Sequence, residues 1–281
     1  MAPRYGIRRL PLCVGPLAVI ARSDTNAIFP ALVEDHIDEF RLDLHRIVRA
    51  GEIVVPQQGQ LYSYLQRFGL GQKTDVGVRG ETSGLLPDGS TWTHQMQDRI
   101  AFGQSVSVNG VQMAAAINTI ANGGVRVSPS LIQGSATTDD GELVGTDTTT
   151  ERRVISTKAA HQTMLMMERV IDPEVGVAPS AAVPGYRVAG KTGTAQRVGT
   201  CLVNGQKQSC YDGTNTVSFA GFAPAEDPRF TVYVVIQAPR IANAGGGITA
   251  GPVFSKLMGF ALQRYGVPPS HRKQTVYTVE W

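Results

Sequence analysis

The chain has 281 residues, 42% hydrophobic and 17% charged, which is typical of a globular protein with a sizeable core. A net charge of +3 and the lack of an arginine-rich run argue against a nucleic-acid-binding protein. No apolar run reaches the roughly 18 residues of a membrane span, and the scattered histidines and cysteines predict no metal site.

Residues 1–56 differ in charge density from everything that follows. Within them, "ALVEDHIDEFRLDLHRIVRAG" (31–51) predicts an amphipathic helix, with Leu32, Phe40 and Leu44 loosely on one side. Next, "LYSYLQRFGLG" (61–71) predicts a helix that stops at a glycine. The Gly- and Pro-rich segment 73–92 predicts a loop.

Two more helices are predicted in the middle of the chain. In "VNGVQMAAAINTIANGG" (108–124), an apolar face recurs at helical spacing, and the helix ends just before Gly123. The members of that face are Met113, Ala116, Ile117 and Ile120. A further helix begins after Ser156, where Ala160, Met164 and Met167 recur with the same period and are expected to pack in the core.

The C-terminal part predicts three strands and a closing helix. The strands are "YRVAGKTGTAQ" (186–196), "TVSFAGFAP" (216–224) and "RFTVYVVIQAP" (229–239). Their short connections favour an antiparallel meander. In the helix 251–266, Val253, Leu257 and Phe260 follow the helical period. We therefore predict an α+β fold with an antiparallel sheet and packed helices.

The first strand carries an ammonium and two hydroxyls where an apolar run is expected. Because side chains alternate along a strand, Lys191 and Gly193 share one side, and Thr192 and Thr194 share the other. The two hydroxyls line up to hold one anionic group, and Gly193 lets another backbone or a ligand approach closely. The ammonium attracts a carboxylate and favours deprotonation of a neighbouring hydroxyl.

Lys-Thr-Gly is the third motif of penicillin-binding proteins and serine β-lactamases. Five segments of the chain resemble, in order, the C-terminal half of the transpeptidase domain of class B penicillin-binding proteins, and among them the septal peptidoglycan transpeptidases of cell division. They are "YLQRFGLGQKT", "FGQSVSVNGVQMAAAINTIANGG", "VAGKTGTAQ", "SFAGFAPAEDPRFTVYVVI" and "GGGITAGPVFSKLM". The resemblance covers about residues 58–267 and implies a partial penicillin-binding or serine β-lactamase-like fold.

The resemblance also implies a reaction. The family attacks the D-Ala–D-Ala bond of a peptidoglycan stem peptide with a serine, forms an acyl-enzyme, and passes the acyl group to an amine. It implies that Lys191 is a catalytic residue on the strand that closes the site, that Thr192, Gly193 and Thr194 bind substrate, and that the Thr194 backbone holds the oxyanion. Stem peptides, β-lactams and division proteins are the implied partners, no cofactor is needed, and the family acts at the extracytoplasmic face of the cell membrane.

Two motifs of the family do not stand where the resemblance places them, ahead of Leu61. We expect the chain to contain no Ser-x-x-Lys nucleophile motif, and Ser107-Val108-Asn109, a Ser-x-Asn, lies in a later segment and is interpreted as a chance match. We expect residues 1–56 to be a segment foreign to the family, 57–270 the C-terminal part of the transpeptidase domain, and 271–281 a tail. The chain is then a truncated form without acylation activity.

Other interpretations stay open at this stage. A non-catalytic module of the same fold, and a β-lactamase or D,D-carboxypeptidase relative, share the Lys-Thr-Gly motif. Cys201 and Cys210 bracket "LVNGQKQS" and form either a disulfide or two free thiols. The remaining candidates are expected to be structural or solvated: Gln196, Arg197, Asp98 and Arg99, together with Asp212 and Asn215 as turn residues of the loop that holds the cysteines.

Overall fold

The computed structural model describes residues 58–76, 80–139 and 141–271, so the predicted helix at 31–51 lies outside the described residues. The helices are α2 (Gln58–Arg67), α3 (His94–Ala101), α4 (Gly110–Ala121), α5 (Thr157–Arg169) and α6 (Gly251–Arg264). The main strands are β5 (Ala189–Val203), β6 (Gln206–Ala223) and β7 (Phe230–Gln237). Short strands β1 (Val125–Val127), β2 (Ala136–Thr137), β3 (Leu143–Val144) and β4 (Glu151–Arg153) form two small antiparallel pairs.

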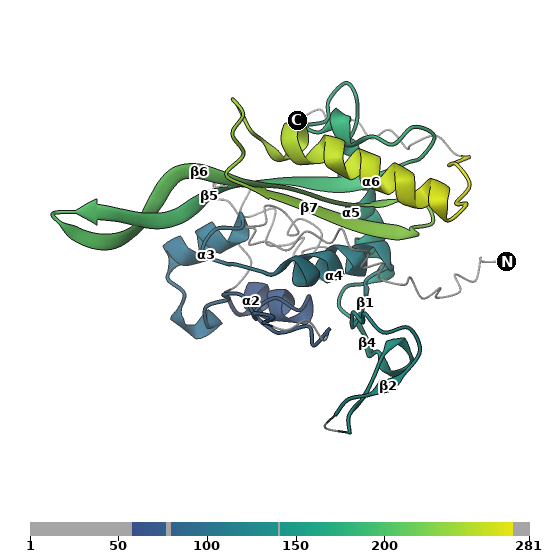
Figure 1. Ribbon diagram of the computed structural model, residues 1–281, viewed down its shortest axis with the longest axis horizontal. Coiled ribbons are helices and arrows are strands. Elements are labelled where there is room, and N and C mark those ends of the chain that lie inside the picture. Colours follow the sequence, from purple (N-terminus) through teal and green to yellow (C-terminus); the bar gives the residue numbers. More distant parts are fainter. Residues whose placement is uncertain (1–57, 77–79, 140, 272–281) are drawn as a thin grey trace, which may run out of the picture.

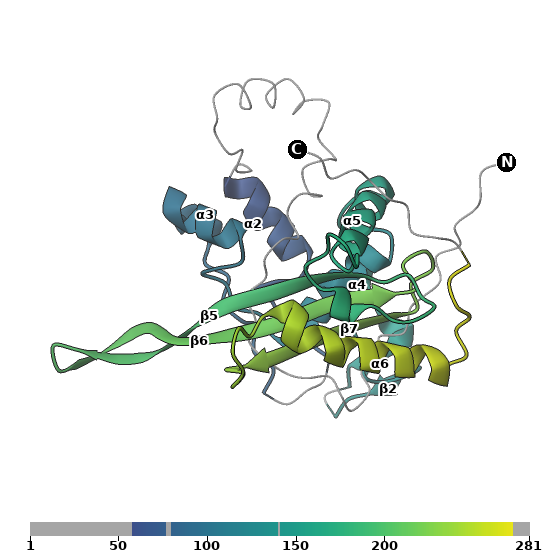
Figure 2. The same ribbon diagram turned by 90° about the horizontal axis from the view of Figure 1, so that it is seen from above.

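The main sheet is the predicted antiparallel meander, with strand order β5-β6-β7. Figure 1 shows α6 on one face of the sheet and α4 on the other, and Figure 2 shows α6 running across the strands. Two buried clusters fill the layers. Phe222 belongs to the cluster shared with α2, α4 and α5, and Phe219 belongs to the cluster shared with α6. None of the helices in the described ranges has the length and apolarity to cross a bilayer.

The two middle helices follow the sequence prediction because their ends are capped. At α4, the Asn109 side chain accepts a hydrogen bond from the Gln112 backbone N–H, while the Gln112 side chain accepts from the Asn109 N–H. At α5, Ser156 accepts from the Ala159 N–H. The apolar face predicted for α4 is buried. The short helix α3 was not predicted, because only Gln97 and Ile100 of its eight residues are buried.

The predicted closing helix is present as α6, but two of the three residues that indicated its period lie outside its buried face. Phe254, Met258 and Leu262 are fully buried, whereas Phe260 is 66% exposed and Val253 is 39% exposed. The buried residues repeat every four positions and therefore also fit the helical period. The ring of Phe254 packs 4.7 Å from that of Phe219 in the sheet, which selects this face.

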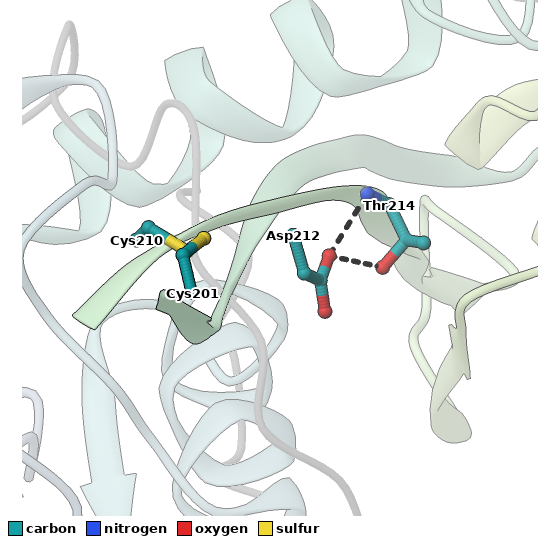
Figure 3. Close-up of a disulfide and its surroundings, with 4 residues drawn as sticks. All are labelled: Cys201, Cys210, Asp212 and Thr214. Carbon is teal, nitrogen blue, oxygen red and sulfur yellow. Dashed lines mark hydrogen bonds between the residues drawn. A yellow bond between two sulfur atoms is a disulfide. The ribbon is translucent and has the colours of Figure 1, made fainter. Parts of the chain in front are cut away.

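Strands β5 and β6 are longer than predicted. The segment around the cysteines, expected to be a loop, continues the hairpin away from the sheet as a two-stranded ribbon, residues 197–214, here called the arm (Figure 1). A disulfide joins Cys201 and Cys210 across it, with Cα atoms 5.9 Å apart. Figure 3 shows this disulfide near Asp212, whose carboxylate accepts hydrogen bonds from the backbone N–H and hydroxyl of Thr214. Asp212 therefore lies within β6, beside a shift in strand register between Gln196 and Val198.

A buried ion pair ties α5 to the segment that leads into β5. Glu168 has a side chain only 2% exposed, and both its carboxylate oxygens accept hydrogen bonds from Arg187, at 2.8 and 2.7 Å. The pair raises the pKa of the Arg187 guanidinium above its usual value, chiefly through the hydrogen bonds to Glu168. Glu226 lies farther away, 4.0 Å from Arg187, with its side chain 26% exposed.

We predict that Glu168→Gln lowers the free energy of unfolding by about 3 kcal/mol, because it leaves the largely buried guanidinium with only the longer contact to Glu226 as a charged partner. Urea denaturation of the two proteins measures the difference. The matched control is Glu226→Gln, which removes a longer and more exposed contact and should cost well under about 1 kcal/mol. Equal losses for the two variants would contradict the assignment.

We predict that replacing Cys201 and Cys210 by serine affects the arm and spares the sheet. An isolated two-stranded ribbon is marginally stable in water, so loss of the cross-link should speed amide hydrogen exchange within residues 198–211. Exchange in Phe219 and Val234, inside the sheet, should stay unchanged. Residue-resolved hydrogen exchange makes the comparison, and uniform acceleration across both regions would argue against a local role.

Candidate active-site strand

The Lys-Thr-Gly tripeptide lies on β5, at the edge of the main sheet. β6 pairs with one side of β5, and in the described part of the chain no strand pairs with the other side. Lys191 is opposite Ala220, a member of the cluster under α4 and α5, and Thr192 is opposite Phe219, a member of the cluster under α6. The ammonium and the hydroxyls therefore leave opposite faces of an edge strand that is open to a ligand.

The side chain of Lys191 is half-buried. Its Nζ donates a 3.0 Å hydrogen bond to the carbonyl of Thr192, and no acidic side chain within the described ranges forms an ion pair with it. Burial lowers the pKa of the ammonium below its usual value of 10.5, because the charged form loses hydration. A cation without a carboxylate partner is suited to attract an external anion.

The hydroxyl of Thr194 lies against the helical turn Gly246–Ala250, which leads into α6. Its Oγ1 accepts a 3.3 Å hydrogen bond from the backbone N–H of Gly246. The same glycine packs directly on the backbone of Gly193, since a Cβ on Gly246 would lie 2.8 Å from the Gly193 oxygen and 2.9 Å from its nitrogen. The close approach expected at Gly193 is thus made by another part of the backbone.

The other candidate residues contact neighbouring residues of the fold or are exposed at its surface. Gln196 and Asn215 are opposite each other in the β5–β6 ladder. Arg197 lies 3.6 Å from the carboxylate of Asp212, and the Thr214 hydrogen bonds lower the pKa of that carboxylate. Asp98 and Arg99 are exposed on α3.

Ser107 and Asn109 of the Ser-x-Asn motif form hydrogen bonds with neighbouring loop residues. Ser107 pairs through its backbone with Leu85. The amide of Asn109 donates to the Glu81 carboxylate at 3.2 Å and to the Thr82 carbonyl at 2.8 Å, while its oxygen caps α4. The amide is therefore used in fixing the loop before α4.

The expectation that the chain contains no Ser-x-x-Lys is wrong, because one occurs at the opposite end from the family's position: Ser270-His271-Arg272-Lys273. Arg272 and Lys273 lie outside the described residues. The Ser270 hydroxyl accepts a 2.9 Å hydrogen bond from the Arg187 backbone N–H, and its own N–H donates to the Gly185 carbonyl. Ser270 itself belongs to an irregular segment and not to a helix.

No three His, Cys, Asp or Glu side chains lie together as metal ligands within residues 58–76, 80–139 and 141–271. The chemistry that these residues offer at β5 is that of a cation, hydroxyls and backbone amides.

Comparison with known proteins adds the decisive observation. Residues 54–259 match the model of the penicillin binding protein transpeptidase domain. The chain belongs to the penicillin-binding protein transpeptidase family. The match covers all three strands of the main sheet and α2 to α5, which agrees with the sequence resemblance.

Relatives and solved structures in this family are similar across three quarters of the chain. Penicillin-binding protein PbpB of Mycolicibacterium smegmatis is 41% identical over 222 residues, 75% of this chain and 33% of PbpB. Peptidoglycan D,D-transpeptidase FtsI of Escherichia coli is 33% identical over 217 residues, 77% of this chain and 34% of FtsI. The chain thus spans about a third of the length of these curated relatives.

Penicillin binding protein 3 of Mycobacterium tuberculosis superposes with a TM-score of 0.63 at 35% identity, over 74% of this chain and 47% of that one. The same protein has been solved in complex with aztreonam and with ampicillin. A transpeptidase domain of penicillin-binding protein 3 from Burkholderia pseudomallei superposes with a TM-score of 0.62 at 33% identity, over 76% of this chain and 60% of that domain. The α+β fold predicted from the sequence is therefore confirmed.

The lowered pKa of Lys191 predicts a specific dependence of stability on pH. Because the folded-state pKa lies below the unfolded value of 10.5, the unfolded chain binds more protons between the two values, and wild-type stability rises with pH there. Lys191→Met removes this dependence. The difference in unfolding free energy between Lys191→Met and wild type should therefore fall as pH rises towards 10.5. Urea unfolding at a series of pH values up to 10.5 measures this difference in unfolding free energy. Lys256→Met, on an exposed lysine of α6, controls for the loss of one charge, and a constant difference would refute the prediction.

Proposed function

We propose that this chain carries the substrate-binding strand of a peptidoglycan D,D-transpeptidase, which recognises the C-terminal carboxylate of a D-Ala–D-Ala stem peptide and the carboxylate of β-lactams. The single observation that carries the proposal is the half-buried Lys191 on an edge strand, with Thr192 and Thr194 on the same strand, inside a chain that belongs to the transpeptidase family.

In this proposal each group of β5 has a distinct task. The Lys191 ammonium supplies a positive potential at the strand and draws the anionic end of the ligand. The hydroxyls of Thr192 and Thr194 donate hydrogen bonds to the carboxylate, which are shorter and stronger than bonds between neutral groups. The backbone N–H of Thr194 donates a hydrogen bond to the carbonyl oxygen of the bound ligand, the atom on which the family's complete reaction develops negative charge.

We infer that the 281 residues bind these ligands without forming an acyl-serine. Covalent catalysis requires a serine hydroxyl activated by a neighbouring base. No Ser-x-x-Lys precedes Leu61, where the family has it, and the Ser270 hydroxyl is engaged by the Arg187 backbone. The whole reaction of the family then needs residues that this sequence does not supply.

Two further assignments rest on the relatives. FtsI and PbpB are about three times as long as the part matched here, and FtsI is named a peptidoglycan D,D-transpeptidase. We propose, on that basis, that the protein works at the extracytoplasmic face of the cell membrane and contacts division proteins.

The experiment compares an acetylated peptide ending in D-Ala–D-Ala with the same peptide ending in a carboxamide. Amide shifts of Lys191 and Thr194 should move on titration with the carboxylate and hardly at all with the carboxamide. Thr194→Val should weaken carboxylate binding about fivefold to tenfold by removing one hydrogen bond to a charged group. A fluorescent penicillin should leave no covalent label. Failure of the carboxylate peptide to shift either amide would refute the binding proposal, and covalent labelling would refute the missing nucleophile.

A further inference from the structure

We propose that Gly246 is a positioning residue, which holds the Thr194 hydroxyl so that its proton points to the ligand carboxylate. The proposal rests on the proposed function, because it assigns the orientation of a group that the proposed site uses. It adds a residue from the far side of the sequence, 52 positions after Thr194, to the site on β5.

The hydrogen bond between the two residues has a direction. The Gly246 N–H donates and Thr194 Oγ1 accepts, at 3.3 Å. A hydroxyl has one proton and two lone pairs, so accepting from a backbone amide occupies a lone pair and leaves the proton available. A carboxylate only accepts hydrogen bonds. Gly246 thus biases Thr194 towards the donor role that an anionic ligand requires.

The approach that makes this bond possible needs a residue without a side chain. A Cβ on Gly246 would lie 2.3 Å from the Ser218 carbonyl oxygen, as well as within 2.9 Å of the Gly193 backbone. These are strand atoms held in the β5–β6 ladder and cannot move aside as a flexible side chain could. Alanine at this position therefore pushes the segment away from β5 and stretches the bond to Thr194.

The opposite side of the same segment is also fixed. The Ser180 hydroxyl donates a 2.6 Å hydrogen bond to the Gly247 carbonyl. A Cβ on Gly247 would lie 2.5 Å from the Val177 carbonyl oxygen. The two glycines are thus held from both ends, since the Gly246 N–H is bound by Thr194 of β5 and the Gly247 C=O by Ser180, and Ser180 supports the position of the Gly246 N–H.

A purely structural alternative is that Thr194 only satisfies the first N–H of the helical run that begins at Gly246. The first N–H groups of a helix have no partner within it, and a threonine hydroxyl meets that need. The two roles differ in one measurable property. Helix capping contributes to stability alone, whereas positioning changes how strongly the site prefers a carboxylate to a carboxamide.

The chain offers a matched pair of substitutions. Gly246→Ala meets three backbone atoms, whereas a Cβ on the neighbouring Gly245 meets nothing within 4 Å, and Gly245 has an extended backbone that alanine adopts readily. The ratio of carboxylate to carboxamide affinity is measured for both by the peptide titration described above. We expect Gly246→Ala to lower this ratio about fivefold to tenfold and Gly245→Ala to leave it unchanged.

Ser180→Ala provides a second route if Gly246→Ala does not fold, because it removes one hydroxyl and adds no atoms. It should lower the carboxylate preference in the same direction by a smaller factor, with little change in melting temperature. In the free protein, Thr194→Val should speed hydrogen exchange of the Gly246 amide, which tests the bond without any ligand.

The outcomes separate the two proposals. If wild type shows no carboxylate preference, the proposed function fails. If wild type prefers the carboxylate but a folded Gly246→Ala keeps that preference, or loses it no more than Gly245→Ala, the positioning role is overturned. If Gly246→Ala is unfolded, an unchanged preference in Ser180→Ala overturns it.

Discussion

The arrangement of the site depends on backbone-to-backbone contact at one end of β5. An edge strand has a free side and is held only by its neighbour and by what packs on its faces. Here Gly246 lies against Gly193 and Ser218 at a distance that admits no side chain. That contact brings the helical turn before α6 to the strand and gives Thr194 its hydrogen-bond partner. On the other face, Lys191 is desolvated without a described acidic partner, which leaves its charge available.

Several parts of the fold were predictable because local and tertiary signals agree. The Asn109 and Ser156 caps coincide with the start of the apolar period, so α4 and α5 appear where the pattern places them. The meander was predictable because short connections leave no room for a crossover. The alternation of Lys191 and Thr192 follows from strand geometry alone, and the register with β6 agrees with it.

Other features lie beyond what pattern analysis resolves. α6 has two apolar faces of equal helical period, and only the position of Phe219 in the sheet chooses between them. The arm is polar in composition, so its strands have no apolar alternation to reveal them. The partnership between Gly246 and Thr194 spans 52 positions and depends on packing distances that no single-sequence pattern encodes. Short motifs carry little information alone, since the Asn109 of the Ser-x-Asn and the Ser270 of the Ser-x-x-Lys both form hydrogen bonds within the fold.

The continuity of β5 from the Lys-Thr-Gly tripeptide into the arm has a mechanical consequence. One strand carries Lys191 and, further along the same backbone, Val198 and Leu202, which are 62% and 72% exposed on the projecting ribbon. The Cys201–Cys210 cross-link stiffens that ribbon, and the register shift after Gln196 is the one break in its ladder with β6. A displacement of the outer end of the ribbon therefore reaches Lys191 along the backbone of one strand, β5.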